Sequence, residues 1–364
     1  MKNRASRYTV ASIPMLCLAS LLVLIIIGLG GGTLPTVSSA PLQAGRFLYA
    51  ANKDSRNISM MRILATGVPV SLGAPINAGQ KPHALVLHPS GQFLFVADEQ
   101  AGTINTFRVN TITGVLSSAG SYAAGKQPMG VIVNPNGQYL YASNHGSDNI
   151  SMFRINTATG GLIPMGSVSA GKQPLGLAIH PSGRFGLVAN KGSNNLTGFR
   201  INPSTGILTP YGNPIPVGVN PTSVAISPSG TIAVVTNQQS NTLSVFAVSP
   251  STQTLTPIGP PVPVGNGPTS VTLTPSGTAL VANQNSNDVT VISVSPGGIA
   301  PIGSVPVGGS GPVSVSVDPG GGFAYVANQN SNNVSVISVS PFGQPMFVGS
   351  VPVGSTPSSV IVAP

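Results

Sequence analysis

GQYLYASNHGSDNISMFRINTATGGLIPMGSVSAGKQPLGLAIHPS occupies residues 137–182, and most of the remaining chain consists of variants of this stretch. The copies begin at Gly45, Gly91, Gly137, Gly183, Gly230, Gly277 and Gly321, so successive copies start 46, 46, 46, 47, 47 and 44 residues apart. A fixed period of this length indicates a repeat architecture in which each copy forms one supersecondary unit.

Each copy contains four short runs that are typical of β-strands. In the third copy these runs are YLYASN, NISMFRI, LIPMGSVS and PLGLAIHP. They are rich in β-branched, aromatic and other apolar residues and are bounded by turn residues such as Pro181-Ser182-Gly183 and Thr159-Gly160. No helical apolar period follows the N-terminal segment. Four antiparallel strands in 44–47 residues describe one blade of a β-propeller.

The phase of the repeat predicts how the ring closes. The first copy opens on a YLYASN-type strand at residues 47–52, and the last copy ends on a PLGLAIHP-type strand at residues 357–362. Seven strands of each type result if the C-terminal strand joins the N-terminal blade, which removes a free sheet edge. We therefore predict an all-β, seven-bladed β-propeller over residues 45–364, with four antiparallel strands per blade.

The first 40 residues have the pattern of a secretory signal. Lys2, Arg4 and Arg7 precede an apolar run over residues 10–29, and small residues follow at 37–40. The run is also close to the length that spans a bilayer, so an uncleaved anchor is the alternative. Both interpretations predict a propeller outside the cytoplasm, either secreted or anchored to the membrane and facing outward, after a short linker at residues 41–44. The single cysteine, Cys17, lies in this segment.

Charge is sparse and unevenly distributed. Charged residues are 6% of the chain, and Gly and Pro number 45 and 35, but they recur at fixed positions of the repeat and therefore indicate order. After residue 45, all 12 Lys and Arg residues fall between Arg46 and Arg200. A basic sector of this kind suits an anionic partner, such as an anionic small molecule, an acidic glycan or an envelope protein. Nucleic acid is disfavoured, because the chain has no Trp and few aromatics near the basic loops.

Two stretches resemble a known family of enzymes. HPSGQFLFVADEQAGTINTFRVNTITGVL (88–116) and HPSGRFGLVANKGSNNLTGFRINPSTGIL (180–208) are similar to the lactonase-type seven-bladed propellers, which include bacterial 6-phosphogluconolactonase, and YVANQNSNNVSVISVSP (325–341) resembles YVTN-type repeats. The resemblance covers residues 45–364 and implies hydrolysis of a sugar lactone. It also implies Arg, His and Glu around the channel mouth, whereas the only Glu here is Glu99 and the last three blades contain neither His nor Arg.

The loop after the first run of each copy and the loop that leads into the fourth run lie on the same face, because successive strands alternate in direction. These loops carry the candidate site. The candidate ligand-binding residues, chosen because they are cationic or imidazole side chains in those loops, are Lys53, Arg56, Lys81, Lys126, His145, Lys172 and Lys191. The alternative is that the lysines are simply solvated. His83 opens a strand expected to line the channel and is the candidate general base, because imidazole titrates near neutrality. We expect His88 and His180, at a repeated turn position, to be structural.

The sequence predicts neither a cofactor nor a metal site, since Asp98 and Glu99 are the only adjacent acids and two carboxylates are a weak cation site. The scarcity of acid–base residues favours a monomeric binding or surface-interaction propeller with a basic face. A lactonase acting on a sugar lactone is the alternative, and a purely structural surface component is the third interpretation.

Overall fold

The structure, a computed structural model, describes residues 46–249, 251–339 and 344–363. The predicted signal or anchor at residues 1–40, the linker at 41–44 and Cys17 lie outside the described residues. Residues Ala44–Pro364 form one compact unit. In the described part of the chain, no helix is long and apolar enough to cross a membrane.

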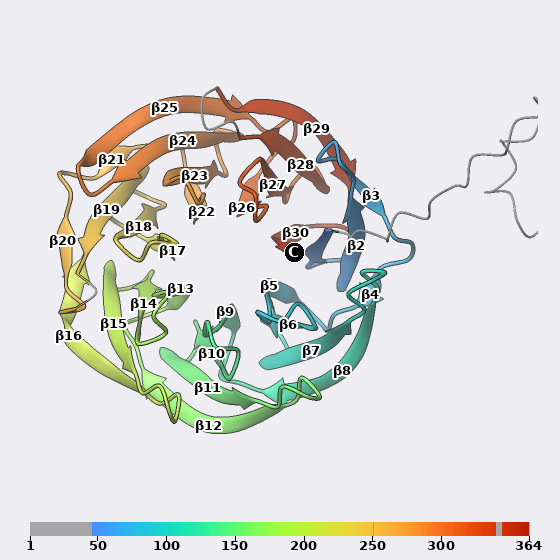
Figure 1. Cartoon of the computed structure of the whole chain (residues 1–364), viewed down its shortest axis with the longest axis horizontal. Coiled ribbons are helices and arrows are strands. Elements are labelled where there is room, and N and C mark those ends of the chain that lie inside the picture. The colour runs from blue at the N-terminus through green and yellow to red at the C-terminus, as the bar shows by residue number, and fades with distance from the viewer. Residues whose placement is uncertain (1–45, 250, 340–343, 364) are drawn as a thin grey trace, which may run out of the picture. The chain divides into compact units, whose positions relative to one another are not determined.

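Seven antiparallel sheets stand around a common axis and form a closed ring (Figure 1). Each sheet is one blade, and consecutive blades follow one another along the chain from blue to red. The prediction of a seven-bladed propeller with four strands per blade is therefore confirmed. The sheet pairings of the described residues run from Phe47 to Ala363.

The strands occupy four radial positions. The innermost strands are β5 (Pro82–Leu87), β9 (Pro128–Val133), β13 (Pro174–Ile179), β17 (Pro221–Ile226), β22 (Pro268–Leu273), β26 (Pro312–Val317) and β30 (Pro357–Ala363). The second strands are β1 (Phe47–Asn52), β6 (Phe93–Asp98), β10 (Tyr139–Asn144), β14 (Phe185–Asn190), β18 (Ile232–Asn237), β23 (Thr278–Asn283) and β27 (Phe323–Asn328). The third strands are β2 (Asn57–Ile63), β7 (Thr103–Val109), β11 (Asn149–Ile155), β15 (Asn195–Ile201), β19 (Thr242–Val248), β24 (Asp288–Ser295) and β28 (Asn333–Ser338). The outermost strands are β8 (Leu116–Ala123), β12 (Leu162–Ser169), β16 (Leu208–Pro216), β25 (Gly298–Pro306) and β29 (Met346–Pro352), with the pairs β3 (Pro69–Ser71) and β4 (Ile76–Asn77), and β20 (Leu255–Pro257) and β21 (Val262–Pro263).

Two outermost strands differ from the prediction because they are split. In the first blade β3 and β4 both pair with β2, and in the fifth blade β20 and β21 both pair with β19. The interruptions contain Gly73 and Pro75 in one case and Pro260 and Pro261 in the other. Proline has no amide hydrogen to donate to the neighbouring strand, but β16 runs unbroken through Pro214 at the position of Pro75 and Pro261, so proline alone does not account for the split.

The ring closes where the C-terminal strand meets the N-terminal blade. Strand β30 pairs antiparallel with β1, from Phe47 opposite Ala363 to Asn52 opposite Pro357. Val360 of β30 is buried in a cluster with Leu48 of β1 and Tyr325 of the seventh blade. The predicted closure is confirmed, and the first blade takes its strands from both ends of the chain.

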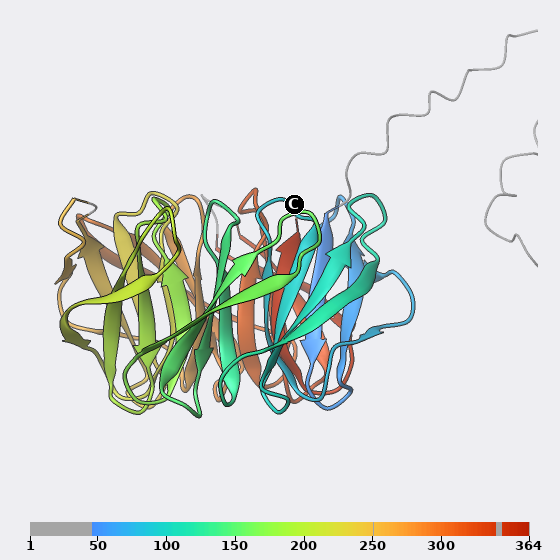
Figure 2. The same cartoon turned by 90° about the horizontal axis from the view of Figure 1, so that it is seen from below.

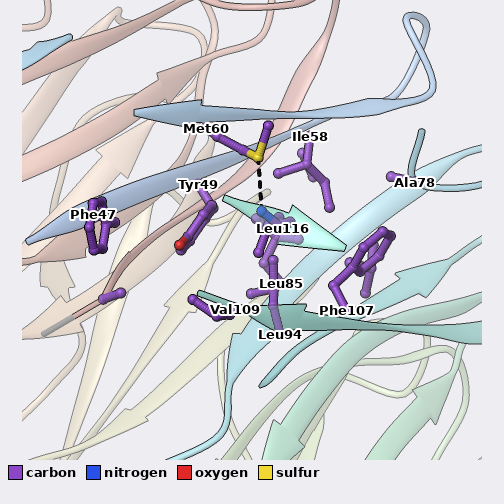
Figure 3. Packing of buried hydrophobic residues seen from close by; sticks show 13 residues of the cluster. Phe47, Tyr49, Ile58, Met60, Ala78, Leu85, Leu94, Phe107, Val109 and Leu116 are labelled. Atoms are coloured by element: carbon purple, nitrogen blue, oxygen red, sulfur yellow. Dashed lines mark hydrogen bonds between the residues drawn. The ribbon is translucent and has the colours of Figure 1, made fainter. Parts of the chain in front are cut away.

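The core lies between neighbouring blades. Figure 3 shows one cluster in which Tyr49 and Met60 of the first blade pack against Leu94 and Leu116 of the second. The Tyr49 hydroxyl donates to the carbonyl of Gly114 at 2.9 Å, a hydrogen bond from one blade to a turn of the next. Gly114 has a positive φ of 75°, and a Cβ there would lie 2.2 Å from the Phe47 ring, so only glycine fits. The blades are therefore held by apolar contact and by recurring tyrosine hydrogen bonds.

The strands give the propeller two distinct faces. The second and third strands of a blade meet at residue pairs such as Asn52 and Asn57 at one face, and they end near pairs such as Phe47 and Arg62 at the other. We call the first the lysine face, because it carries the lysines of the described residues, Lys53, Lys81, Lys126, Lys172 and Lys191. We call the second the arginine face, because it carries Arg46, Arg62, Arg108, Arg154, Arg184 and Arg200. The red strand β30 ends at the arginine face, at the top of Figure 2.

The closure can be tested with two matched substitutions. Val360→Asp places an unpaired charge in the interface between the first and seventh blades, and we expect it to lower the free energy of unfolding by several kcal/mol. Val348→Asp, at an exposed position of β29, should change it by less than about 0.5 kcal/mol. Urea denaturation monitored by circular dichroism measures both, and equal effects would contradict the proposed role of β30.

Candidate functional site

A repeated backbone hydrogen bond brings two loops together on the lysine face. In each blade, the first residue after the second strand donates its N–H to the carbonyl of the residue that precedes an innermost strand. The pairs run from Lys53 N to Thr356 O at 2.9 Å and Glu99 N to Lys81 O at 3.0 Å through to Gln329 N to Gly311 O at 2.7 Å. Seven equivalent residues are thereby placed next to the innermost strands, around the axis.

We call these seven residues the axial ring: Lys53, Glu99, His145, Lys191, Gln238, Gln284 and Gln329. The members from the first four blades are titratable, whereas the last three blades supply only glutamine amides. Neighbouring members touch: Lys53 Nζ lies 3.4 Å from Glu99 Oε2, and Gln284 donates from Nε2 to Gln329 Oε1 at 3.2 Å. The axial ring therefore has one sector for charge chemistry and one for neutral hydrogen bonding.

Glu99 is the buried centre of the charged sector. It is 8% exposed, and its two oxygens face Lys53 Nζ at 3.4 Å and Lys81 Nζ at 3.2 Å. Burial lowers the pKa of the Lys53 ammonium, and the carboxylate of Glu99 opposes that shift. A carboxylate between two ammonium groups fixes their positions and leaves the group of three with a net positive charge.

His83, the second residue of β5, stands beside this group. Its ring is half-buried, and its Nδ1 is buried with no hydrogen-bond partner among the described residues. The pKa of His83 lies well below its ordinary value, first because of burial and then because of the positive charge of Lys53. Lys81 and His145 act in the same direction, and a hydrogen bond with the backbone of Met129 opposes them. His83 is therefore a neutral imidazole near pH 7.

An unsatisfied buried nitrogen is uncommon and costs stability. Equivalent positions in other blades avoid that cost: the hydroxyls of Ser358, Thr222 and Thr269 donate to a proline carbonyl of the next innermost strand at 2.9–3.1 Å. A water molecule or a ligand oxygen at His83 Nδ1 would satisfy the imidazole. The position is thus suited to accept a proton.

His145 contributes a second imidazole to the same sector. Burial lowers its pKa, and the charge of Lys191 lowers it further, whereas Glu99 and Asp148 raise it. Like His83, it is half-buried and favours its neutral form at neutral pH.

The remaining predicted ligand-binding residues lie farther out. Lys172 is exposed and donates to Asp148 Oδ2 at 2.8 Å. The pKa of Asp148 is lowered first by the hydrogen bond that it accepts from the Gln173 N–H and then by the one from Lys172. Lys126 and Arg56 are exposed as well. The structure therefore gathers Lys53, Lys81, His83, His145 and Lys191 in or beside the charged part of the axial ring. Arg56, Lys126 and Lys172 lie farther from the axis. Their role in binding stays a prediction.

Two other histidines have the surroundings of turn residues. His88 Nδ1 lies 2.7 Å from Ser90 Oγ and its Nε2 lies 2.9 Å from the carbonyl of Gly137. His180 repeats these contacts with Ser182 and Gly230. Their side chains thus bridge each turn to the next blade, as a structural role requires.

Glu99 is the residue that sequence reasoning undervalued. The sequence presents it as the only Glu of the chain and, with Asp98, as a weak cation site, but the two side chains separate. Asp98 accepts from the N–H groups of Gln80, Lys81 and Ala101 and braces its turn, while Glu99 faces the lysines. The signal was available in the repeat, because Glu99 occupies the position of Lys53, His145 and Lys191.

An open cavity adjoins this sector. It has a volume of about 740 Å³ and lies between the second and third blades, where Glu99, Lys126, Gln127, Met152 and Phe153 contribute to its lining. It can admit a small organic molecule, and Glu99 is the one member of the group Lys53, Lys81, His83 and Glu99 that contributes to its lining. Among the described residues, no group of three or more His, Cys, Asp or Glu side chains is placed to hold a metal ion.

The fold and the axial ring define a seven-bladed propeller with a cationic, imidazole-containing cluster on one face. The family model for the lactonase, seven-bladed β-propeller matches residues 40–133, 126–225, 219–298 and 266–361. The chain belongs to this family. No curated protein matches it at a significant level.

Solved structures resemble the chain in fold at low sequence identity. A proposed 6-phosphogluconolactonase from Bacteroides uniformis shares 18% identity with a TM-score of 0.79, covering 88% of this chain and 100% of that one. The periplasmic gluconolactonase PpgL of Pseudomonas aeruginosa shares 21% identity with a TM-score of 0.77, covering 88% and 99%. The likeness extends over nearly the whole of both structures.

The charge environment of His83 predicts a measurable shift of its pKa. Lys53→Met removes a positive charge beside the ring, so the pKa of His83 should rise towards its ordinary value. Lys172→Gln removes an exposed lysine that pairs with Asp148 and should leave the pKa of His83 unchanged. A pH titration of the histidine NMR signals measures both, and an unchanged pKa in Lys53→Met would contradict the assigned cause.

The same shift predicts a pH dependence of stability. Because the pKa of His83 in the folded state lies below that of about 6.5 in the unfolded chain, the unfolded state binds more protons between the two values. The stabilisation is fully present above pH ~6.5 and is lost as the pH falls through the folded-state pKa. Denaturation of wild type and His83→Gln at several pH values should show a weaker dependence in the variant.

Proposed function

We propose that the chain hydrolyses the ring ester of a sugar lactone at the cluster formed by His83, Glu99, Lys53 and Lys81. The observation that carries this proposal is the neutral imidazole of His83, whose Nδ1 is buried without a partner beside two ammonium groups. Membership of the lactonase family supports hydrolysis rather than binding alone. The names of the relatives, a gluconolactonase and a proposed 6-phosphogluconolactonase, support the same substrate class.

The chemistry assigns one role to each group. The neutral His83 takes a proton from a water molecule whose oxygen attacks the lactone carbonyl carbon. Lys53 and Lys81 stabilise the negative charge that develops on the carbonyl oxygen, and Glu99 holds them in place. When the bond between the carbonyl carbon and the ring oxygen breaks, protonated His83 returns its proton to that oxygen. The products are a hydroxyl group and a carboxylic acid, which releases its remaining proton to the solvent and becomes a carboxylate.

The neutral part of the axial ring suits the rest of a sugar. Gln238, Gln284 and Gln329 offer amide donors and acceptors opposite the charged sector, and all three are half-buried. Such groups hydrogen-bond hydroxyls and orient a polyhydroxylated ring. We assign them the binding of the substrate hydroxyl groups.

We further propose that hydrolysis takes place outside the cytoplasm. The basis is the apolar run at residues 10–29, preceded by Lys2, Arg4 and Arg7. The name of the periplasmic Pseudomonas relative supports this location. A fusion of the first 44 residues to a reporter protein, assayed in cell fractions, tests it.

Turnover of a panel of sugar lactones tests the activity. We expect hydrolysis by the wild type, a loss of about 10²- to 10⁴-fold in His83→Gln because the proton acceptor is removed, and a clear loss in Glu99→Gln. Gln138→Ala, an exposed position near the opposite face, serves as the matched control and should retain full activity. Wild-type rates in His83→Gln, or no turnover of any lactone by the wild type, would contradict the proposal.

A further inference from the structure

The two faces of the propeller differ sharply in charge. The lysine face carries the five lysines and Arg56 with five acids, Asp54, Asp98, Glu99, Asp148 and Asp288, which leaves a net charge of +1. The arginine face carries six arginines with one acid, Asp318, which leaves a net charge of +5. Among the described residues, Arg46 is the one member of this set that pairs with an acid, at 2.7 Å from Asp318. The other five guanidinium groups have no carboxylate partner there.

Apolar side chains are exposed at the same end of the blades. The large exposed apolar residues of the described chain, with the exception of Val219, lie in the turn after a third strand or at the start of an outermost strand: Leu64, Val70, Ile112, Val115, Ile163, Ile207, Met346, Phe347 and Val348. Ile112 is the most exposed, at 67%. These turns belong to the arginine face, so the first four blades present both arginines and exposed apolar side chains there, and the seventh presents apolar side chains alone.

The arginines are not required by the blade fold. Arg108 lies over the Phe93 ring at 5.3 Å and Arg200 over the Tyr211 ring at 4.1 Å, and both side chains are exposed. The seventh blade has an aromatic residue at the position of Phe93, namely Phe323, but pairs it with Ser338 and has no arginine. Stacking therefore orients the guanidinium groups at the surface without being needed to build a blade.

We propose that the arginine face docks on an anionic phospholipid membrane, with the guanidinium groups on lipid phosphates and the aliphatic turn residues entering the interface. Charge complementarity is the first argument: five arginines without a carboxylate partner among the described residues meet a negative surface, although Arg108 also donates to the Ala158 carbonyl and Arg200 to Gln253. Each basic residue near such a surface contributes roughly a fivefold increase in binding. The second argument is the exposed aliphatic set. An acidic polymer would need only the charge, whereas a membrane also takes up Ile, Leu and Val side chains.

Docking by this face leaves the lysine face, with its axial ring, directed towards solvent. The two faces lie at opposite ends of the strands (Figure 2), so substrate access and membrane contact do not compete. The proposal is independent of lactone hydrolysis, because it rests on residues that the candidate site does not use.

Vesicle sedimentation with the isolated propeller, residues 44–364, tests the proposal. We expect binding to vesicles of phosphatidylcholine with about one third phosphatidylglycerol, and little binding to phosphatidylcholine alone. The triple variant Arg108→Gln, Arg154→Gln, Arg200→Gln should bind the anionic vesicles on the order of 100-fold more weakly. The matched control Arg56→Gln, Lys126→Gln, Lys172→Gln removes three exposed cations from the lysine face and should bind like the wild type.

Ile112→Ser separates a membrane from other anionic partners. It should weaken binding to the anionic vesicles several-fold and leave binding to dextran sulfate, a soluble acidic polymer, unchanged. Equal losses in the two triple variants would overturn the proposal, because attraction would then be a matter of net charge alone. Unchanged vesicle binding in Ile112→Ser would overturn the proposal in favour of an acidic polymer as the partner. Loss of vesicle binding in the presence of free phosphate would overturn it in favour of a site for a small anion.

Discussion

The pairing of β30 with β1 is the interaction on which both the ring and its site depend. It supplies the innermost strand of the first blade from the far end of the chain. It also brings Thr356 to Lys53, whose N–H donates to the Thr356 carbonyl at 2.9 Å. Lys53 thereby takes its place beside Glu99 of the second blade. A ring left open at this seam would lose a structural contact and one of the two ammonium groups of the candidate site.

Much of this architecture could be predicted from the repeat. Strands β10, β11 and β12 coincide with the runs YLYASN, NISMFRI and LIPMGSVS, because period, turn residues and alternation agree. Strand β13 ends at Ile179, two residues before the end of its run, because the His180 side chain hydrogen-bonds to Ser182 in the turn and to the carbonyl of Gly230. The split of the outermost strands in the first and fifth blades does not follow from the average pattern of the repeat, since β16 carries a proline at the same position and is continuous.

The candidate site was predicted less completely. His83 and all seven predicted ligand-binding positions could be placed on one face by counting strands, but which four of the seven gather near His83 could not. The importance of Glu99 could not be found in this way, because it depends on which side chains of neighbouring blades meet. That meeting is a three-dimensional property: Lys53, Lys81 and Glu99 come from different turns and are joined by salt bridges of 3.2–3.4 Å.

The asymmetry of the ring follows from one fact about composition. Every basic residue of the described chain lies between Arg46 and Arg200, so four blades carry the positive charge, and the other three carry amides and hydroxyls with Asp288 and Asp318 as their charged residues. On the lysine face this gives a charged sector opposite glutamines. On the arginine face it gives a set of guanidinium groups of which, among the described residues, Arg46 alone has a carboxylate partner. Repetition thus builds the scaffold, and departures from the repeat build its two surfaces.

The most direct test of the site uses the four histidines of the chain as probes. A sugar lactam, in which nitrogen replaces the ring oxygen of the lactone, resists hydrolysis and should bind at the cluster. In NMR spectra of the propeller labelled at histidine, our account predicts that the lactam shifts the ring signals of His83 and His145 and leaves those of His88 and His180 unchanged. Saturable binding that moves His88 or His180 but not His83 would contradict it.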